Sequence, residues 1–77
     1  MDGRIITIDA EILGGTPVFS GTRVPIKNLF DYLASGESIG SFLEDFESVK
    51  EEQVVKLLLL SHKLIQQSTV LLNENFA

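Results

Sequence analysis

The segment Gly14–Ile26, GGTPVFSGTRVPI, most constrains what this chain can fold into. Glycine supplies the positive φ that tight turns need, and proline cannot continue the interior of a helix. The pair Ser20-Gly21, between Pro17–Phe19 and Thr22–Val24, predicts a hairpin with a two-residue loop. Pro25 suits the first position of a following helix, where its missing N–H costs nothing. The segment is therefore expected to be a small β-arm that leads into a helix.

A two-stranded arm is marginal in water on its own. It must pack on the rest of the chain, pair with another strand, or pair with a second chain. The β-branched run Arg4–Ile8 predicts a short strand that could be that partner. Glu11–Leu13 favours one helical turn. The glycines that follow are interpreted as a flexible hinge, because no Gly-Lys-Ser/Thr sequence makes them a phosphate loop. The residues expected to hold the arm in shape are Gly14, Gly15, Pro17, Gly21, Thr22 and Pro25.

Three helices are predicted after the arm. The first covers Ile26–Ser35 and is stopped by Gly36, and the second covers Ile39–Asp45 with Ser38 as its N-cap. The third begins after Ser48, because Ser48 and Glu51 form a capping-box pattern, and it continues at least to Gln67.

The joint Phe46–Val49 between the last two helices fits a helix-turn-helix. We therefore predict a mainly α fold in a single domain. It consists of a β-arm and hairpin (1–25), a three-helix helix-turn-helix bundle (26–67) and a C-terminal tail (68–77).

Apolar residues repeat at helical spacing and give the candidate core. In the first helix they are Ile26, Leu29, Phe30 and Leu33; in the second, Ile39, Phe42, Leu43 and Phe46; in the third, Val54, Leu57, Leu58, Leu64 and Ile65, with the polar Ser61 in the same buried stripe. A helix that is apolar beyond one stripe is buried on more than one side. The residues left over, which we expect to form a dimer or partner surface, are Val55, Leu59, Leu60, Leu71 and Leu72. The small size of the chain, 77 residues, also favours oligomerisation as a source of stability.

The charge balance limits the choice of partners. Eleven acidic residues against six Lys and Arg give a net charge of −5, which repels nucleic-acid phosphate at long range. DNA binding would therefore need a local basic patch. Without cysteine there is neither a disulfide nor a thiolate metal site. The first apolar run is broken by Asp9 and Glu11, unlike a signal peptide, and Leu57–Leu60 is too short to cross a bilayer, so we expect a cytoplasmic protein without a membrane partner.

The candidate DNA or partner contacts are Arg23, Lys27, Lys50, Gln53 and Lys56. The Arg23 guanidinium could clamp a phosphate or a partner carboxylate. The favoured alternative is an internal contact that fixes the arm, either an ion pair with Asp31, Glu44 or Asp45 or a hydrogen bond to a backbone carbonyl. Gln53 could read adenine and the lysines could meet phosphates. Glu51 and Glu52 oppose this, since they fit a helix start that faces solvent and complement its dipole.

No pattern of catalytic residues is found. The acidic residues between Glu44 and Glu52 lack the D-x-D-x-D-G spacing of a calcium loop, and they are interpreted as a solvated face or as a mimic of nucleic acid for a basic partner. His62 is the single histidine, so it cannot form a metal site with others of its kind, and we place it at an interface rim. Hydrolase, kinase, zinc and nucleotide motifs are missing. We therefore expect no enzyme activity, no cofactor and no small-molecule substrate.

Three stretches carry a resemblance to a known family: ILGGTPVFSGTRVPI, SGESI and FLEDF. Together they resemble the domain of unknown function 433 family, whose core reads I-x-G-G-x-P-V-x-x-G-T-R-[IV]-P, followed by a helix, a G-x-S/T-I joint and an acidic helix ending in D-[YF]. The matching positions are Ile12, Gly14, Gly15, Pro17, Val18, Gly21, Thr22, Arg23, Val24, Pro25, Gly36, Ser38, Ile39, Glu44, Asp45 and Phe46. Members often begin the third helix with S/T-P-E, where this chain has Ser48-Val49-Lys50-Glu51.

The resemblance implies a homeodomain-like helix-turn-helix preceded by a β-arm, often as a dimer. It also implies an antitoxin paired with a nuclease-like toxin of the PIN type. From the residues and the resemblance together, we expect a regulator that binds such a toxin and operator DNA as a dimer through the arm and the third helix. A protein-interaction or structural module without DNA binding is the alternative.

Overall fold

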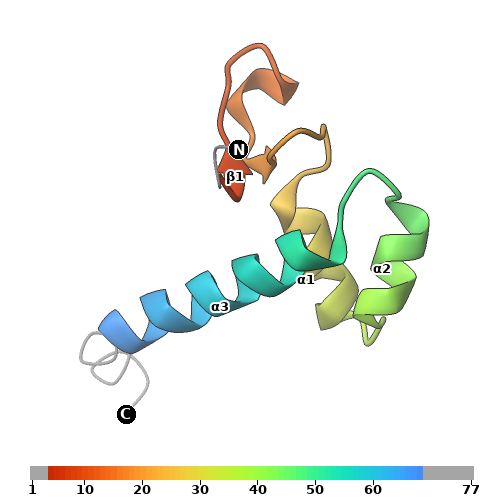
Figure 1. Cartoon of the computed structure of the whole chain (residues 1–77), viewed down its shortest axis with the longest axis vertical. Helices are drawn as coiled ribbons and strands as arrows, with labels where there is room; N and C mark the ends of the chain where they lie inside the picture. Colours follow the sequence, from red (N-terminus) through yellow and green to blue (C-terminus); the bar gives the residue numbers. More distant parts are fainter. Residues whose placement is uncertain (1–3, 69–77) are drawn as a thin grey trace.

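The computed structural model describes residues 4–68 of the chain. Its elements are β1 (Ile6–Thr7), the 3-10 turn η1 (Leu13–Gly15), β2 (Val18–Phe19), α1 (Ile26–Ala34), α2 (Ile39–Asp45) and α3 (Glu51–Gln67). Figure 1 shows α1 and α2 together at one end of the longer α3. This confirms the predicted fold class, a mainly α three-helix bundle with a small N-terminal sheet. Within the described residues, no helix is long and apolar enough to cross a membrane.

The arm is held by pairing inside the chain. Strands β1 and β2 are antiparallel, with Ile6 opposite Phe19 and Thr7 opposite Val18. A hydrogen bond between the Thr7 and Ser20 hydroxyls, 2.9 Å long, continues the contact. Val18 and Phe19 are fully buried, so the arm also packs on the helices. Of the ways to stabilise the arm, the structure thus uses pairing with the N-terminal strand and packing on the bundle.

The predicted two-residue turn at Ser20-Gly21 is present, since the Thr22 N–H donates to the Phe19 carbonyl at 3.0 Å, but strand pairing resumes only at Val24. The Phe19 N–H donates to the Val24 carbonyl at 3.0 Å, which leaves four residues, Ser20–Arg23, between the paired positions. The Thr22 hydroxyl is the reason, since it donates to the Phe19 carbonyl at 2.8 Å and accepts from the Val24 N–H at 3.0 Å. The Thr22 side chain thereby makes hydrogen bonds to the backbone that a paired strand residue would otherwise make. Gly21 has φ = 80°, as the turn prediction required.

The glycine pair before the arm lies in a hydrogen-bonded turn. Gly14 and Gly15 have φ values of 67° and 95°. The Gly15 N–H donates to the Ile12 carbonyl, and both the N–H and the hydroxyl of Thr16 donate to the Leu13 carbonyl. The left-handed backbone explains why two glycines are used here. Their interpretation as a flexible hinge stays a prediction.

The ends of the first two helices follow the predicted signals. At the end of α1, the Glu37 N–H donates to the Tyr32 carbonyl at 2.9 Å, and Gly36 has φ = 86°, as in a Schellman motif. The Ser38 hydroxyl accepts from the Ser41 N–H at 3.0 Å and caps α2. α1 ends at Ala34, one residue before the predicted Ser35.

The predicted start of α3 was wrong. The N-cap is Lys50 rather than Ser48, and the connection from α2 holds five residues, Phe46–Lys50. The Val49 side chain is almost completely buried, so the chain must turn it into the core before the helix can begin. A lysine side chain cannot accept a capping hydrogen bond. Instead, Gln53 Oε1 accepts from the Lys50 N–H at 2.9 Å.

The core is centred on aromatic rings. Phe42 is fully buried, and its ring centroid lies 5.9 Å from that of Phe19, 5.4 Å from Tyr32 and 4.9 Å from Phe46. Around these rings pack Leu29, Val49, Val54 and Leu57. Phe30 was wrongly placed in the core, since it is 40% exposed, and Tyr32 takes the inward position on α1.

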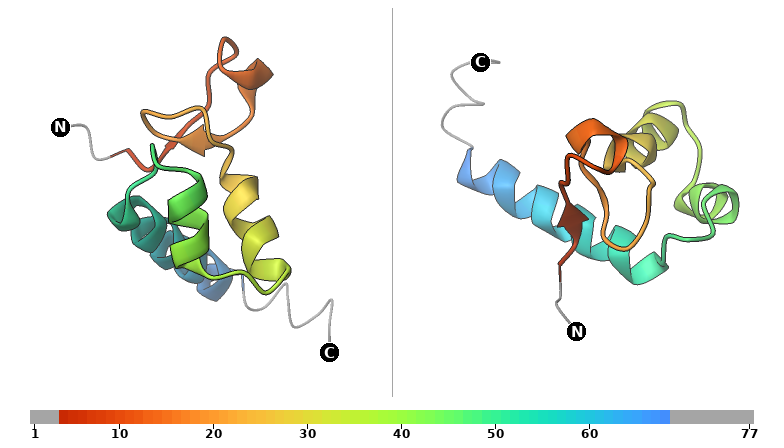
Figure 2. Two further views of the ribbon diagram at one scale, coloured as in Figure 1. Left: turned by 90° about the vertical axis from the view of Figure 1, so that its right-hand side faces the viewer. Right: turned by 90° about the horizontal axis from the view of Figure 1, so that it is seen from above.

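The apolar stripe of α3 is buried only over its first half. Val54 and Leu57 are buried and Leu58 is half-buried, but Leu64 is 53% exposed and Ile65 is 57% exposed. Their predicted burial was wrong, because α3 continues past the end of α1 and α2, as the right-hand view in Figure 2 shows. The predicted tail contacts Leu71 and Leu72 lie outside the described residues.

One hydrogen bond links α1 to α2 and affects a titration. The Tyr32 hydroxyl donates to the Asp45 carboxylate at 2.5 Å, and this bond raises the pKa of Tyr32 above the ordinary 10.0. Because the folded state holds the phenol proton more tightly than the unfolded state, this contribution to stability is present below pH 10 and is lost as the pH rises through the folded-state pKa.

We expect Asp45→Asn to move the pKa of Tyr32 back toward its ordinary value. The chain has one tyrosine and no tryptophan, so ultraviolet absorbance of tyrosinate reports this group alone. Glu44→Gln removes a neighbouring exposed carboxylate and should leave the titration unchanged. Equal curves for Asp45→Asn and the wild type would contradict the contact.

Candidate functional site

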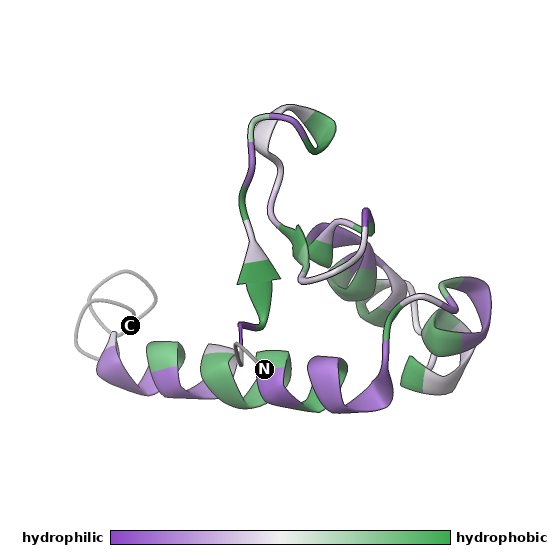
Figure 3. Cartoon of the chain, turned by 45° about the horizontal axis from the view of Figure 1, so that its top comes forward, coloured by the Kyte–Doolittle hydropathy of each residue, from purple (hydrophilic) through white to green (hydrophobic). Residues whose placement is uncertain are grey.

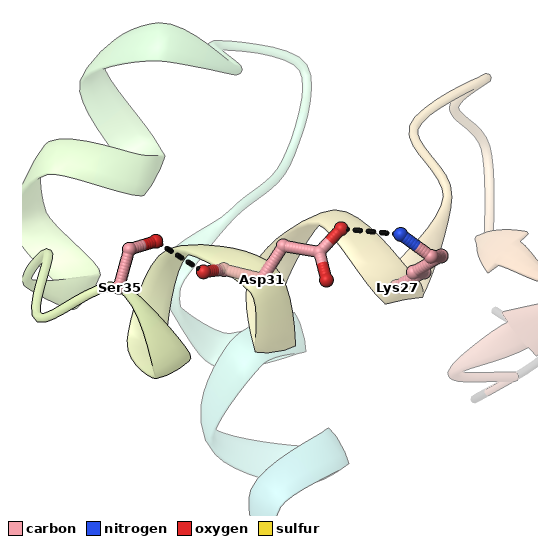
Figure 4. A network of polar contacts seen from close by, with 3 residues as sticks. All are labelled: Lys27, Asp31 and Ser35. Carbon is pink, nitrogen blue, oxygen red and sulfur yellow. Dashed lines mark hydrogen bonds and ion pairs between the residues drawn. The ribbon is translucent and has the colours of Figure 1, made fainter.

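The predicted contact residue Arg23 lies exposed in the four-residue hairpin loop. Within residues 4–68, it forms none of the internal ion pairs that were favoured for it. Asp31 instead pairs with Lys27 one helical turn away at 2.6 Å, and Asp45 accepts from Tyr32. Figure 4 shows this Lys27–Asp31 contact, with the Ser35 hydroxyl donating to the Asp31 carbonyl. The Arg23 guanidinium therefore faces solvent and is available to an outside anion.

Lys27 is less available than Arg23. Its ammonium group is committed to Asp31, although both side chains are more than half exposed. An exposed i,i+4 pair of this kind contributes only about 0.3–0.5 kcal/mol. A partner with a stronger anion could therefore displace Asp31 at small cost.

Gln53 has a structural position that the sequence did not reveal. Its amide accepts from the Lys50 N–H through Oε1 and donates from Nε2 to the Ser20 carbonyl at 2.9 Å. The side chain thus joins the first turn of α3 to the hairpin loop. A base-reading role would have to replace both hydrogen bonds. A glutamine three residues after an N-cap is typical of a capping box, and this pattern could have predicted the contact between Gln53 and Lys50. It was missed because the helix start was predicted at Ser48 and not at Lys50.

The first turns of α3 present mixed charge. Lys50, Glu51, Glu52 and Lys56 are all exposed there, so two cations stand among two carboxylates. Such a surface gives no continuous basic strip for a phosphate backbone. The two glutamates lie in the first turn of α3, where they complement the helix dipole.

Apolar residues on the outer side of α3 form a second exposed feature. Val55 is 46% exposed and Leu59 is 63% exposed, one turn apart on the helix, whereas Leu60 is half-buried. We call Val55 and Leu59 the outer ridge. The exposed Lys56 and Lys63 flank it, and in the described part of the chain neither forms an ion pair. Figure 3 shows apolar residues recurring along the length of α3, beyond the part that the bundle covers.

The described residues bring no metal-binding cluster together. Among residues 4–68 there is no group of three or more His, Asp or Glu side chains placed to hold a metal ion. His62 is exposed on α3. Of the predicted contacts, the structure brings together the hairpin loop of Arg23 and the α3 start of Lys50 and Gln53, through the hydrogen bond to Ser20.

The relative and the family that this chain matches are both described without a function. One relative is the "Uncharacterized protein y4eO" of Sinorhizobium fredii (strain NBRC 101917 / NGR234), 42% identical over 51 residues. The aligned part covers 66% of this chain but only 23% of the relative, so the chain spans less than a quarter of that protein's length. No solved structure matches. The family model described as "Protein of unknown function (DUF433)" matches residues 6–59, from β1 into α3, and the chain therefore belongs to the DUF433 family.

Proposed function

We propose that this chain is the regulatory protein of a toxin–antitoxin pair. It acts in the cytoplasm, without catalysis of its own, by binding a nuclease-like toxin of the PIN type, and as a dimer it binds operator DNA. The observation that carries the protein-binding part is the outer ridge. Val55 and Leu59 are exposed side by side on a helix that already buries its other face in the core.

The chemistry around the ridge supports a protein partner. Lys56 and Lys63 stand two turns apart along the same side of α3, beside Leu59. An apolar contact flanked by two available cations suits a partner segment with apolar side chains between carboxylates. The acidic balance of the whole chain, −5, would at the same time draw it to the basic surface of a nuclease.

The DNA-binding part rests on a different observation. The order of α2, a five-residue turn and α3 is that of a helix-turn-helix, with Arg23, Lys50 and Lys56 exposed around the start of α3. Glu51, Glu52 and the committed Gln53 amide weaken this part. A protein-interaction module without DNA binding is the alternative, and the mixed charge of the first turns favours it.

Affinity capture from the lysate of the native host tests the protein-binding part. The bait is used with and without nuclease treatment, and the bound proteins are identified by mass spectrometry. We expect a small nuclease-like protein that survives nuclease treatment. Leu59→Glu should abolish its capture, because a carboxylate then occupies the ridge, whereas Leu64→Glu, on the opposite side of α3, should retain it. Equal capture by both variants, or capture of no nuclease-like protein, would overturn the proposal.

Titration with operator-containing DNA at two salt concentrations tests the DNA-binding part of the proposal. Specific binding that weakens at the higher salt supports a DNA-binding regulator, since phosphate contacts release counterions. Absence of binding at the lower salt removes DNA from the proposal and leaves the protein-interaction module.

A further inference from the structure

The protruding half of α3 has a defined apolar face. Leu64 lies seven residues, or two turns, after the buried Leu57, and Ile65 lies two turns after the half-buried Leu58. The core-facing stripe therefore continues beyond the bundle onto Leu64 and Ile65, which are 53% and 57% exposed. We call this pair the inner ridge. It lies on the side of α3 opposite to the outer ridge, so one partner helix cannot cover both.

The inner ridge is uncharged and permits the close approach of another helix. Its stripe runs through Ser61, whose hydroxyl donates to the Leu57 carbonyl at 2.9 Å and so has its own hydrogen bond inside the helix. A small residue with a satisfied hydroxyl lets another helix come near without burying an unpaired polar group. Lys56 and Lys63 lie on another side of the helix, while His62, one turn before Ile65, borders the ridge.

We propose that the inner ridge is covered by a second copy of this chain, with the two α3 helices antiparallel and related by a two-fold axis near Leu64. Each copy then packs Leu64 and Ile65 against the same residues of the other. This deepens the dimer in the proposed function by naming its surface, and it requires neither the toxin nor DNA.

Charge decides between the two ridges. A two-fold contact places identical surfaces together, and the inner ridge can do so without bringing like charges into contact. The same contact centred on Leu59 would bring Lys56 of one copy toward Lys63 of the other. Glu52 lies twelve residues before Leu64, about 18 Å along the helix at 1.5 Å per residue. An antiparallel contact near Leu64 therefore also keeps the acidic starts of the two helices apart.

The mass of the purified full chain in solution tests this contact. Over a range of concentrations, light scattering of the wild type should give twice the chain mass of 8.5 kDa. Leu64→Glu should give the mass of a single chain at concentrations where the wild type is fully dimeric. Leu59→Glu is the matched control, because it makes the same change at an exposed leucine of the same helix, and it should remain a dimer.

Folding of the variants is checked by circular dichroism, and Ile65→Glu provides a second disruption of the same ridge. The melting temperature of the wild type should rise with protein concentration, while that of Leu64→Glu should not. A wild type that is monomeric at every concentration, or a Leu64→Glu variant that is folded and still dimeric, would overturn the inference. A wild type that forms the dimer but captures no nuclease-like protein would instead count against the proposed function alone.

Discussion

Phe42→Ala should lower the free energy of unfolding by about 3–5 kcal/mol, the range for removing a buried aromatic side chain. Phe42 is fully buried, and its ring contacts the rings of Phe19, Tyr32 and Phe46, which come from β2, α1 and the end of α2. Small domains are stable by only about 5–15 kcal/mol in total. The variant should therefore unfold at much lower urea concentration, as followed by circular dichroism at fixed protein concentration.

Phe30→Ala is the matched control for this prediction. Phe30 is 40% exposed on α1, so its removal leaves no closed cavity, and we expect a loss of about 1 kcal/mol or less. If the two alanine variants were equally stable, the assignment of Phe42 to the centre of the core would be wrong.

Gly21→Val should cost about 1–3 kcal/mol, at the upper end of that range because valine is β-branched. Gly21 has φ = 80°, and apart from its two chain neighbours no residue has an atom within 4 Å of the position that a Cβ would occupy. The loss would therefore come from the backbone conformation alone and not from a clash. It is measured as the shift in the urea midpoint with an unchanged slope.

Asparagine at the same position distinguishes a loss of stability caused by the backbone conformation from one caused by a steric clash. Gly21→Asn adds a larger side chain but tolerates the left-handed region, so it should lie much closer to the wild type than valine does. A valine variant as stable as the wild type would mean that the loop does not require a positive φ at this position.

The parts of the fold that could be predicted are those fixed by local backbone chemistry. Gly21 and Gly36 have the positive φ that their turns need, and Ser38 caps α2 through its own hydroxyl. Each depends on residues within one turn, and the sequence shows these directly. The fold class and the family could be predicted from the same turn and cap residues.

The parts that could not be predicted depend on contacts between elements. Ser48 and Glu51 satisfy a capping pattern, but burial of Val49 moves the helix start to Lys50. Periodicity placed Leu64 on the core face of α3 correctly, yet it says nothing about where the neighbouring helices end.

The internal ion pair predicted for Arg23 does not form, for a related reason. Asp31 pairs with Lys27 one turn away in α1, and Asp45 accepts from Tyr32 across the contact between α1 and α2. For the candidate site, the sequence named the exposed residues of the outer ridge, Val55 and Leu59, but it missed the role of Gln53 in joining the hairpin loop to α3.

The two hydrogen bonds of Gln53 restrict which amino acid this position can accept. A glutamate would suit the helix dipole, as Glu51 and Glu52 do in the same turn, and it could still accept from the Lys50 N–H. It could not donate to the Ser20 carbonyl, and two oxygens would then face each other. The link between arm and bundle thus selects a neutral amide within an acidic turn, because changing one side-chain atom from nitrogen to oxygen would replace this hydrogen bond with a repulsive contact between two oxygens.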